Sequence, residues 1–178
     1  MTESSLVDPS ELAQYQAGDP ALLLAHAEGL VRGYCGWHIA PSRNELMHVD
    51  GTGTRELYLP TLHLTDVFYI ADNDQVIDLA DIDWWHYGRV RRYDGGFGEV
   101  CWTARKQAVE VEVEHGYSST PPDVAAVVCS LADRTIVSPT GVRSEAAGSV
   151  SITYADGATS FTSDELRVLN RYRIWNRP

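Results

Sequence analysis

The segment AVEVEVEH, residues 108–115, alternates cleanly between apolar and charged residues, which constrains how this part of the chain can fold. Its valines and glutamates alternate, and successive side chains of a β-strand point to opposite faces of the sheet. We therefore predict a strand with one face in the core and one face that is hydrated or repels negatively charged groups. The predicted core face carries Val109, Val111 and Val113, and the acidic face carries Glu110, Glu112 and Glu114.

Shorter segments with the same two-residue period precede this strand from residue 46 onward. They are separated by turn-forming sequences at Asp50-Gly51, Asn73-Asp74 and Asp94-Gly95-Gly96. Residues 46–115 are therefore predicted to form an antiparallel β region. Its other strands are expected in LMHV, RELYLP, LHLTDVFYI, WWHYG, GRVRRY and GEVCWTA.

Helix signals lie before the β region, over residues 8–36. Asp8, Pro9 and Glu11 are typical of a capped helix start, and Asp19-Pro20 begins a second helix over residues 20–34. The periodicity of this second helix predicts an opposing Glu28–Arg32 pair and one apolar face. That face carries Leu23, Ala27, Leu30, Val31 and Tyr34.

Further helix signals follow the β region. Residues 121–137 predict a helix that is apolar nearly all round, as in the centre of a bundle or an assembly. Residues 138–178 predict a loop, a short strand and a final helix whose capping box pairs Thr162 with Glu165. The apolar face of this helix is predicted to carry Leu166, Val168, Leu169, Tyr172 and Trp175. The 178 residues suit a single domain, 1–178, that buries roughly 70% of its extended-chain surface. We predict an α+β fold, with a helical core into which the antiparallel β region is inserted.

The charge of the chain is unevenly distributed. The net charge is −11, yet four of the 14 basic residues and none of the 25 acidic residues lie at or after Leu166. An acidic body argues against tight wrapping of nucleic acid, because binding to phosphates needs Lys and Arg. No apolar stretch approaches the ~20 residues that span a bilayer, so no membrane partner is expected.

The sequence carries no convincing catalytic or metal-binding motif. Cys35, Cys101 and Cys129 form no CxxC pair, and the six histidines show neither HxH nor HExxH spacing. With no signal-peptide pattern at the start, we expect reduced thiols in a cytoplasm. A nucleophilic Cys35 assisted by His38 is possible in principle, but a buried structural cysteine is the commoner case. We therefore predict a protein that is not an enzyme and has no cofactor and no metal.

Two features leave other functions open. Trp84, Trp85 and Trp102 would suit a platform for sugars or bases, although core packing of half of these aromatic residues is the commoner arrangement. The glutamate row would suit a glycosidase only if two carboxylates faced each other across a cleft, which one strand does not provide. A non-enzymatic β-rich module that binds carbohydrate or protein is thus the alternative function.

The order of motifs resembles the head-to-tail adaptor proteins of tailed bacteriophages, of the siphophage type, which are also called connector or head-completion proteins. The resemblance covers the chain from about Pro9 to Ile174. It rests on ALLLAHAEGLVRGYCGWHIAPS, RELYLPTLHLTDV, VEVEVEHGYSSTPPDVAAVVCSLADR, GVRSEAAGSVSITY and FTSDELRVLNRYRI in that order.

The resemblance implies a structural virion protein at the head-tail junction, assembled in the host cytoplasm. Its homo-oligomeric ring, twelvefold when assembled, would join the portal to the tail or next neck protein and let duplex DNA pass without sequence-specific binding. The C-terminal segment would dock on the portal. A further hypothesis is that the glutamate row, Glu110, Glu112 and Glu114, faces the channel. The docking residues expected on this basis are Leu166, Arg167, Leu169, Arg171, Tyr172, Arg173 and Trp175.

Overall fold

A computed structural model describes residues 10, 18–94, 98–137, 144–147, 150–153 and 160–174. These residues fall into two compact units. The helical unit contains the described residues up to Tyr34 and those from Pro122 to Arg171. The β unit contains Cys35–Pro121 and the described residues from Tyr172 onward. Within these ranges, no helix is both long enough and apolar enough to cross a membrane.

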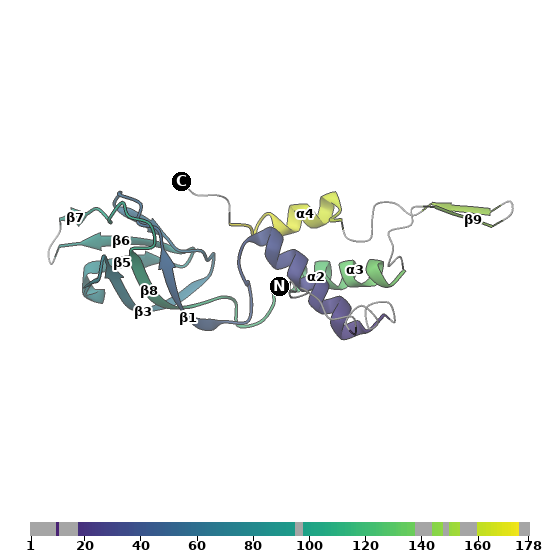
Figure 1. Cartoon of the computed structure of the whole chain (residues 1–178), viewed down its shortest axis with the longest axis horizontal. Helices are drawn as coiled ribbons and strands as arrows, with labels where there is room; N and C mark the ends of the chain where they lie inside the picture. The colour runs from purple at the N-terminus through teal and green to yellow at the C-terminus, as the bar shows by residue number, and fades with distance from the viewer. Residues whose placement is uncertain are drawn as a thin grey trace, which may run out of the picture. The chain divides into compact units, whose positions relative to one another are not determined.

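The helical unit contains the helices α2 (Pro20–Cys35), α3 (Pro122–Val137) and α4 (Ser163–Leu169), which are labelled in Figure 1. It also contains a hairpin of β9 (Ser144–Ala147) and β10 (Val150–Thr153). The first predicted helix start, with Asp8, Pro9 and Glu11, lies outside the described residues. The mixed α+β class is confirmed, and all strands of the β unit, β1 to β8, lie between α2 and α3 in the sequence.

Helix α2 has the predicted amphipathic character. Leu23, Ala27 and Val31 are buried, and Leu30 and Tyr34 are half-buried on the same face. On the solvent side, Arg32 lies 3.1 Å from Glu28, as the i,i+4 spacing predicts.

Helix α3 presents an apolar face to the unit and a more polar face to solvent. Cys129 and Ser130 are exposed on its outer side. The buried residues of α3 are Val124, Val127, Val128, Leu131, Ala132 and Thr135.

Helix α4 begins with the predicted capping box and ends earlier than its apolar pattern suggests. Glu165 N donates to Thr162 Oγ1 at 3.3 Å, and Thr162 N donates to Glu165 Oε2 at 2.8 Å. The helix ends at Leu169, and Arg171 N then donates to the Val168 carbonyl in a tighter turn. Tyr172 therefore lies beyond the helix.

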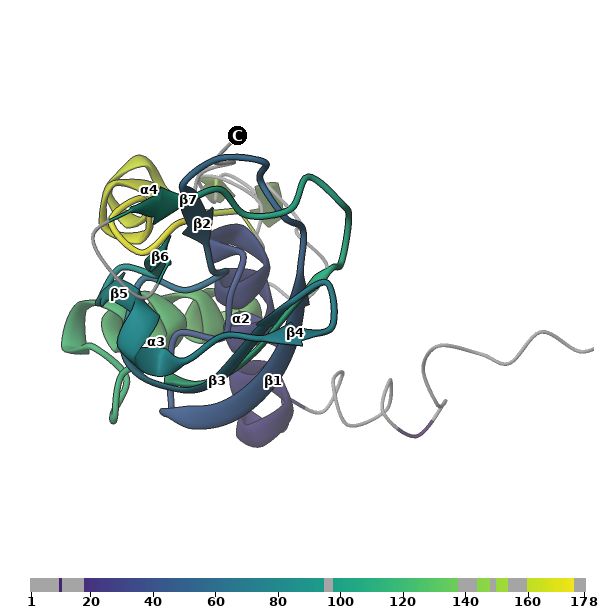
Figure 2. The same ribbon diagram turned by 90° about the vertical axis from the view of Figure 1, so that its left-hand side faces the viewer.

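The β unit contains two antiparallel sheets, and most of their strands are labelled in Figure 2. The first has the order β1 (Arg43–Val49), β8 (Val109–His115), β3 (Leu64–Asp72) and β4 (Gln75–Val76). The second has the order β2 (Glu56–Tyr58), β6 (Arg89–Tyr93) and β5 (Ile82–Trp85), with β7 (Glu99–Val100) also paired to β6. A short 3-10 helix, Leu79–Asp81, precedes β5.

The core of the β unit follows the alternation in β8. Val109, Val111 and Val113 are each 0% exposed, which confirms the predicted core face. Leu57, Ile82, Val90 and Trp102 join them from the second sheet and the segment after β7. Apolar area from both sheets is thus removed from water in one cluster, which is the main stabilising term for such a unit.

Candidate functional site

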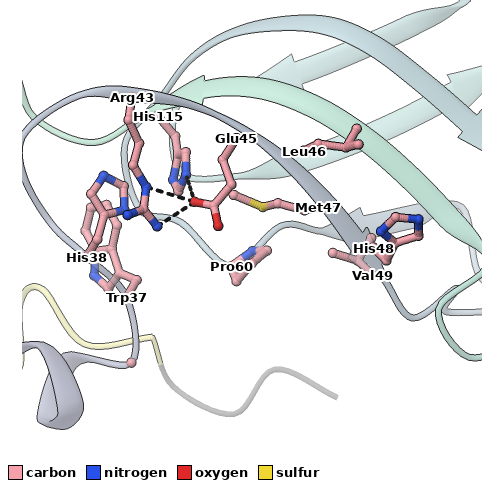
Figure 3. A pocket seen from close by; sticks show the side chains of 11 residues that line it. Trp37, His38, Arg43, Glu45, Leu46, Met47, His48, Val49, Pro60 and His115 are labelled. Carbon is pink, nitrogen blue, oxygen red and sulfur yellow. Dashed lines mark hydrogen bonds and ion pairs between the residues drawn. The ribbon is translucent and has the colours of Figure 1, made fainter.

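A pocket with a volume of about 450 Å³ opens on the β unit beside β1 (Figure 3). Its polar side chains come from three segments: the loop after α2, strand β1 and the last residue of β8. The walls contain His38, Arg43, Glu45, His48 and His115, together with Gly36, Trp37, Leu46, Met47, Val49 and Pro60.

Register places Glu45 and His115 together at one end of the core face. In the β1–β8 pairing, Arg43 lies opposite His115 and Glu45 lies opposite Val113, so these residues share the face of the buried valines. The Nε2 atom of His115 lies 3.0 Å from Glu45 Oε2, and His115 is only 2% exposed.

His38 completes a cluster with Glu45 and His115. The ring centroids of His38 and His115 are 4.4 Å apart, with an edge-to-face angle of 79°. One potential ligand atom from each of the three residues lies within 4.8 Å of the other two. His38 Nε2 also lies 3.0 Å from the Pro41 carbonyl oxygen.

Gly116 allows His38 to approach the end of β8. Gly116 has φ +101°, and a Cβ atom there would lie 2.4 Å from His38 Nε2 and 3.0 Å from the Pro41 carbonyl oxygen. A larger residue would therefore meet both a left-handed backbone and a steric clash.

The protonation states of the cluster follow from burial and from Arg43. Burial lowers the pKa of His115 below its usual value, against the opposing effect of the hydrogen bond with Glu45. Burial also lowers the pKa of His38, and the nearby His115 and Arg43 lower it further. Burial alone would raise the pKa of Glu45, but its hydrogen bonds with His115 and Arg43 outweigh this effect and lower it. At neutral pH the cluster thus holds two neutral imidazoles and one carboxylate.

The structure distributes the predicted docking residues between exposed and internal positions. Arg167 is exposed and lies 3.2 Å from Asp164, whereas Arg171 lies 2.9 Å from Asp123 on α3. Leu166 is half-buried, and Leu169 is 0% exposed within the helical unit.

The remaining docking residues follow α4. In the β unit, the Tyr172 carbonyl accepts a hydrogen bond from Trp37 Nε1 at 2.7 Å, and the Tyr172 ring packs edge-on against Tyr117. Arg173 is half-buried, and Trp175 lies outside the described residues. Along this segment, exposed side chains such as Arg167 and Arg171 therefore alternate with internal ones such as Leu169.

The predicted acidic face is present on the outer side of the first sheet. Glu112 is exposed, while Glu110 and Glu114 are half-buried. Register places His48, Leu46 and Asn44 of β1 opposite Glu110, Glu112 and Glu114, respectively. His48 lies 4.0 Å from Glu110, and Leu46 is 54% exposed, so the face combines acids with an apolar side chain.

The three tryptophans of the suggested platform do not share one exposed face, and Cys35 is not accessible. Trp102 is 2% exposed, and the Arg89 guanidinium carbon lies 3.8 Å from the centroid of the Trp85 ring, which leaves Trp84 as the exposed member of the three. Cys35 is buried, and burial raises the pKa of its thiol to about 11, which opposes a nucleophilic role at neutral pH. The predicted burial of Cys35 is confirmed.

The grouping of His38, Glu45 and His115 was not predicted from the sequence. Their spacings of seven and seventy residues match no ligand motif, and the β1–β8 register that unites two of them is a long-range property. The alternation in β1 offered one signal, because it places Glu45 on the same face as Met47 and Val49.

Comparison with known proteins identifies a fold. No family model matches the chain, and the comparison with curated proteins gave no match. One similar solved chain belongs to the neck of a native gene transfer agent (GTA) particle computed with C12 symmetry, at a TM-score of 0.59 and 14% identity. Another belongs to the neck of an empty GTA particle computed with C6 symmetry, at a TM-score of 0.55 and 14% identity. The alignments cover 100% and 99% of this chain and 98% and 96% of those chains, so the shared fold extends over the whole length.

Proposed function

We propose that this protein is a structural component of the neck of a phage-like particle, where it forms a homo-oligomeric ring between the portal and the tail or next neck protein. The observation that carries this proposal is the full-length fold similarity to neck chains of particles computed with C12 and C6 symmetry. The order of sequence motifs, which resembles siphophage head-to-tail adaptors, supports it independently.

A ring with twelve copies would place this protein at the head-tail junction and leave a channel for duplex DNA. The net charge of −11 suits such a passage, because an acidic protein does not hold the phosphate backbone. The proposed role needs contacts between copies and with the portal, and it requires no catalytic group.

The proposed portal-docking surface consists of the side chains after the capping box that solvent reaches, chiefly Leu166, Arg167 and Arg171. Arginines at such a surface orient a partner through hydrogen-bonded pairing with acids, while apolar contacts supply affinity. Leu169 is internal in this conformation, so a truncation before it would damage the fold as well as the docking surface. Surface substitutions are therefore the sharper test.

Reversing two charges, Arg167→Glu with Arg171→Glu, is expected to abolish ring formation on the candidate portal. Both side chains are exposed, and the ion pairs that they make with Asp164 and Asp123 lie at the surface, so the fold should tolerate the change. Electron microscopy of the protein mixed with the portal would show rings for the natural sequence and none for the double variant.

The matched control for this test is Lys106→Glu, which reverses an exposed charge in the β unit. Rings that persist with the double variant would place the portal anchor elsewhere. If neither the natural sequence nor the control formed rings on the portal, the adaptor function itself would be contradicted.

We also propose that the acidic face of β8 lines the channel. Replacing Glu110, Glu112 and Glu114 by glutamine removes three charges per copy at nearly constant shape. Assembled rings of this variant should retain duplex DNA at low salt, whereas rings of the natural sequence should release it. Asp133→Asn, on the exposed side of α3, is the control. Equal DNA retention by the variant and the control rings would argue against a channel position.

A further inference from the structure

We propose that His38, Glu45 and His115 form a binding site for one divalent transition-metal ion, with Zn²⁺ as the best match. The donors are two imidazole nitrogens and one carboxylate oxygen, a set that zinc sites use with water in the fourth position. Within the described ranges, these three residues are a group whose potential ligand atoms all lie within 4.8 Å of one another.

The geometry needs little change to accept an ion. Ligand atoms around tetrahedral zinc are about 3.3 Å apart, given bonds of about 2.0–2.1 Å. His115 Nε2 and Glu45 Oε2 are already 3.0 Å apart, and the His38 ring stands edge-to-face against the His115 ring. Small side-chain rotations would therefore bring all three donors to one centre. Figure 3 shows them together at one end of the pocket.

His115 is the buried member of the cluster. Its side chain is 2% exposed, and its Nδ1 atom has no hydrogen-bond partner among the described residues. An ion shared with Glu45 would bind Nε2, the ring nitrogen that lies 3.0 Å from the carboxylate, so Nδ1 does not mark the position of the ion. Nδ1 would instead be the second ring nitrogen, which in metal-binding histidines is held by a carboxylate, a carbonyl or a water.

The protonation states also suit a metal. Imidazole binds metals when neutral and carboxylate binds when ionised, and burial and hydrogen bonding favour those forms here. The ligands come from the loop after α2, from β1 and from the end of β8, so a bound ion would fasten that loop to the sheet.

Arg43 is the competitor that an ion must overcome. Its Nε and Nη2 atoms donate to Glu45 Oε2 at 2.9 and 2.6 Å, and its positive charge repels a cation. The Arg43 side chain is 51% exposed, so it can turn to solvent when an ion takes its place. Arg43→Gln should therefore bind zinc several-fold more tightly than the natural sequence.

The test is a calorimetric titration of the full chain with Zn²⁺. The titration uses protein without a histidine tag, because a tag would bind zinc. The substitutions Cys101→Ser and Cys129→Ser are included to remove the exposed thiols, which also bind zinc. We expect one ion per chain, and the affinity should fall at least about 100-fold in His38→Gln and in Glu45→Gln. Both variants spare the buried His115, and circular dichroism without metal checks their fold.

The matched control is His48→Gln, which changes an exposed histidine of the same pocket outside the cluster and should leave affinity unchanged. Co²⁺ bound to the natural sequence should show the visible absorption of a tetrahedral centre, and His38→Gln should lose it. The proposal is overturned if folded protein binds no zinc, or if His48→Gln weakens binding as much as His38→Gln does. These results concern only the metal and do not depend on ring assembly.

Discussion

Replacing Trp102 by alanine is expected to lower the free energy of unfolding of the β unit by about 3–5 kcal/mol. The side chain is 2% exposed and packs in the cluster that joins the two sheets. Its removal leaves a large cavity that neighbouring side chains can fill only in part. Urea unfolding followed by circular dichroism would measure the loss, because tryptophan fluorescence itself changes with the substitution.

Two further variants test whether the stability loss comes from lost packing. One keeps an aromatic ring but removes the indole N–H, and the other removes a tryptophan that is partly exposed. Trp102→Phe should cost much less than Trp102→Ala, since Trp102 Nε1 has no hydrogen-bond partner in the part of the chain that the structure describes. Trp84→Ala, at a tryptophan that is 37% exposed, should cost less than about 1 kcal/mol. A large loss at Trp84 with a small one at Trp102 would contradict the assignment of core and surface.

The sequence predicted those elements whose signals are local. The alternation in residues 109–115 correctly identified the buried valines, because a strand with one face in the core cannot shift register without exposing them. The capping box at Thr162 and Glu165 and the Glu28–Arg32 pair are likewise defined within one helical turn. Propensity and periodicity act at this range, so the sequence is sufficient for such features.

Features that depend on contacts between segments far apart in the sequence could not be predicted from it. The length of α4 is one example: its apolar pattern continues to Tyr172, but the chain instead leaves the helix after Leu169. Beyond it, the Tyr172 carbonyl accepts from Trp37, and Ile174 N donates to the Cys35 carbonyl at 2.8 Å. These tertiary hydrogen bonds replace the next helical turn.

The candidate site also depends on contacts between segments that are far apart in the sequence. Glu45 and His115 meet through the pairing of two strands that lie far apart in sequence, and His38 reaches them because Gly116 has no side chain. From the sequence alone, the six histidines are equivalent candidates for a binding role. Burial separates them, because His115 is 2% exposed whereas the side chain of His48 is 57% exposed. The number of candidate donors was known from the sequence, but their arrangement was not.

Replacing Glu165 by glutamine is expected to destabilise the helical unit by about 2–3 kcal/mol at neutral pH. The carboxylate accepts from Arg134 Nη1 at 2.7 Å and from Arg134 Nη2 at 2.9 Å, in a two-pronged pair that joins α3 to α4. It also accepts from the Thr162 backbone N–H in the capping box. Glutamine keeps the shape but leaves the half-buried Arg134 without its counter-charge.

The pH dependence of this difference provides a second measurement. Burial alone would raise the pKa of Glu165, but the hydrogen bonds from Arg134, Thr162 and Ser130 outweigh it and lower the pKa from 4.5 to about 2. A carboxyl with a lowered pKa in the folded state stabilises that state above its unfolded pKa, and this contribution disappears as the pH falls. The shift corresponds to about 3 kcal/mol. The stability advantage of the natural sequence over Glu165→Gln should therefore shrink between about pH 5 and pH 2.

Asp164→Asn is the matched control, one residue away and on the same helix. Asp164 pairs with Arg167, but the two side chains are 88% and 81% exposed, so water screens their attraction. The substitution should change stability by less than about 1 kcal/mol at neutral pH, even with the loss of a charge near the helix N-terminus. If Asp164→Asn cost as much as Glu165→Gln, a general charge effect would explain both results. If the advantage of Glu165 were instead constant down to pH 2, its ionised pairing with Arg134 would not be its source.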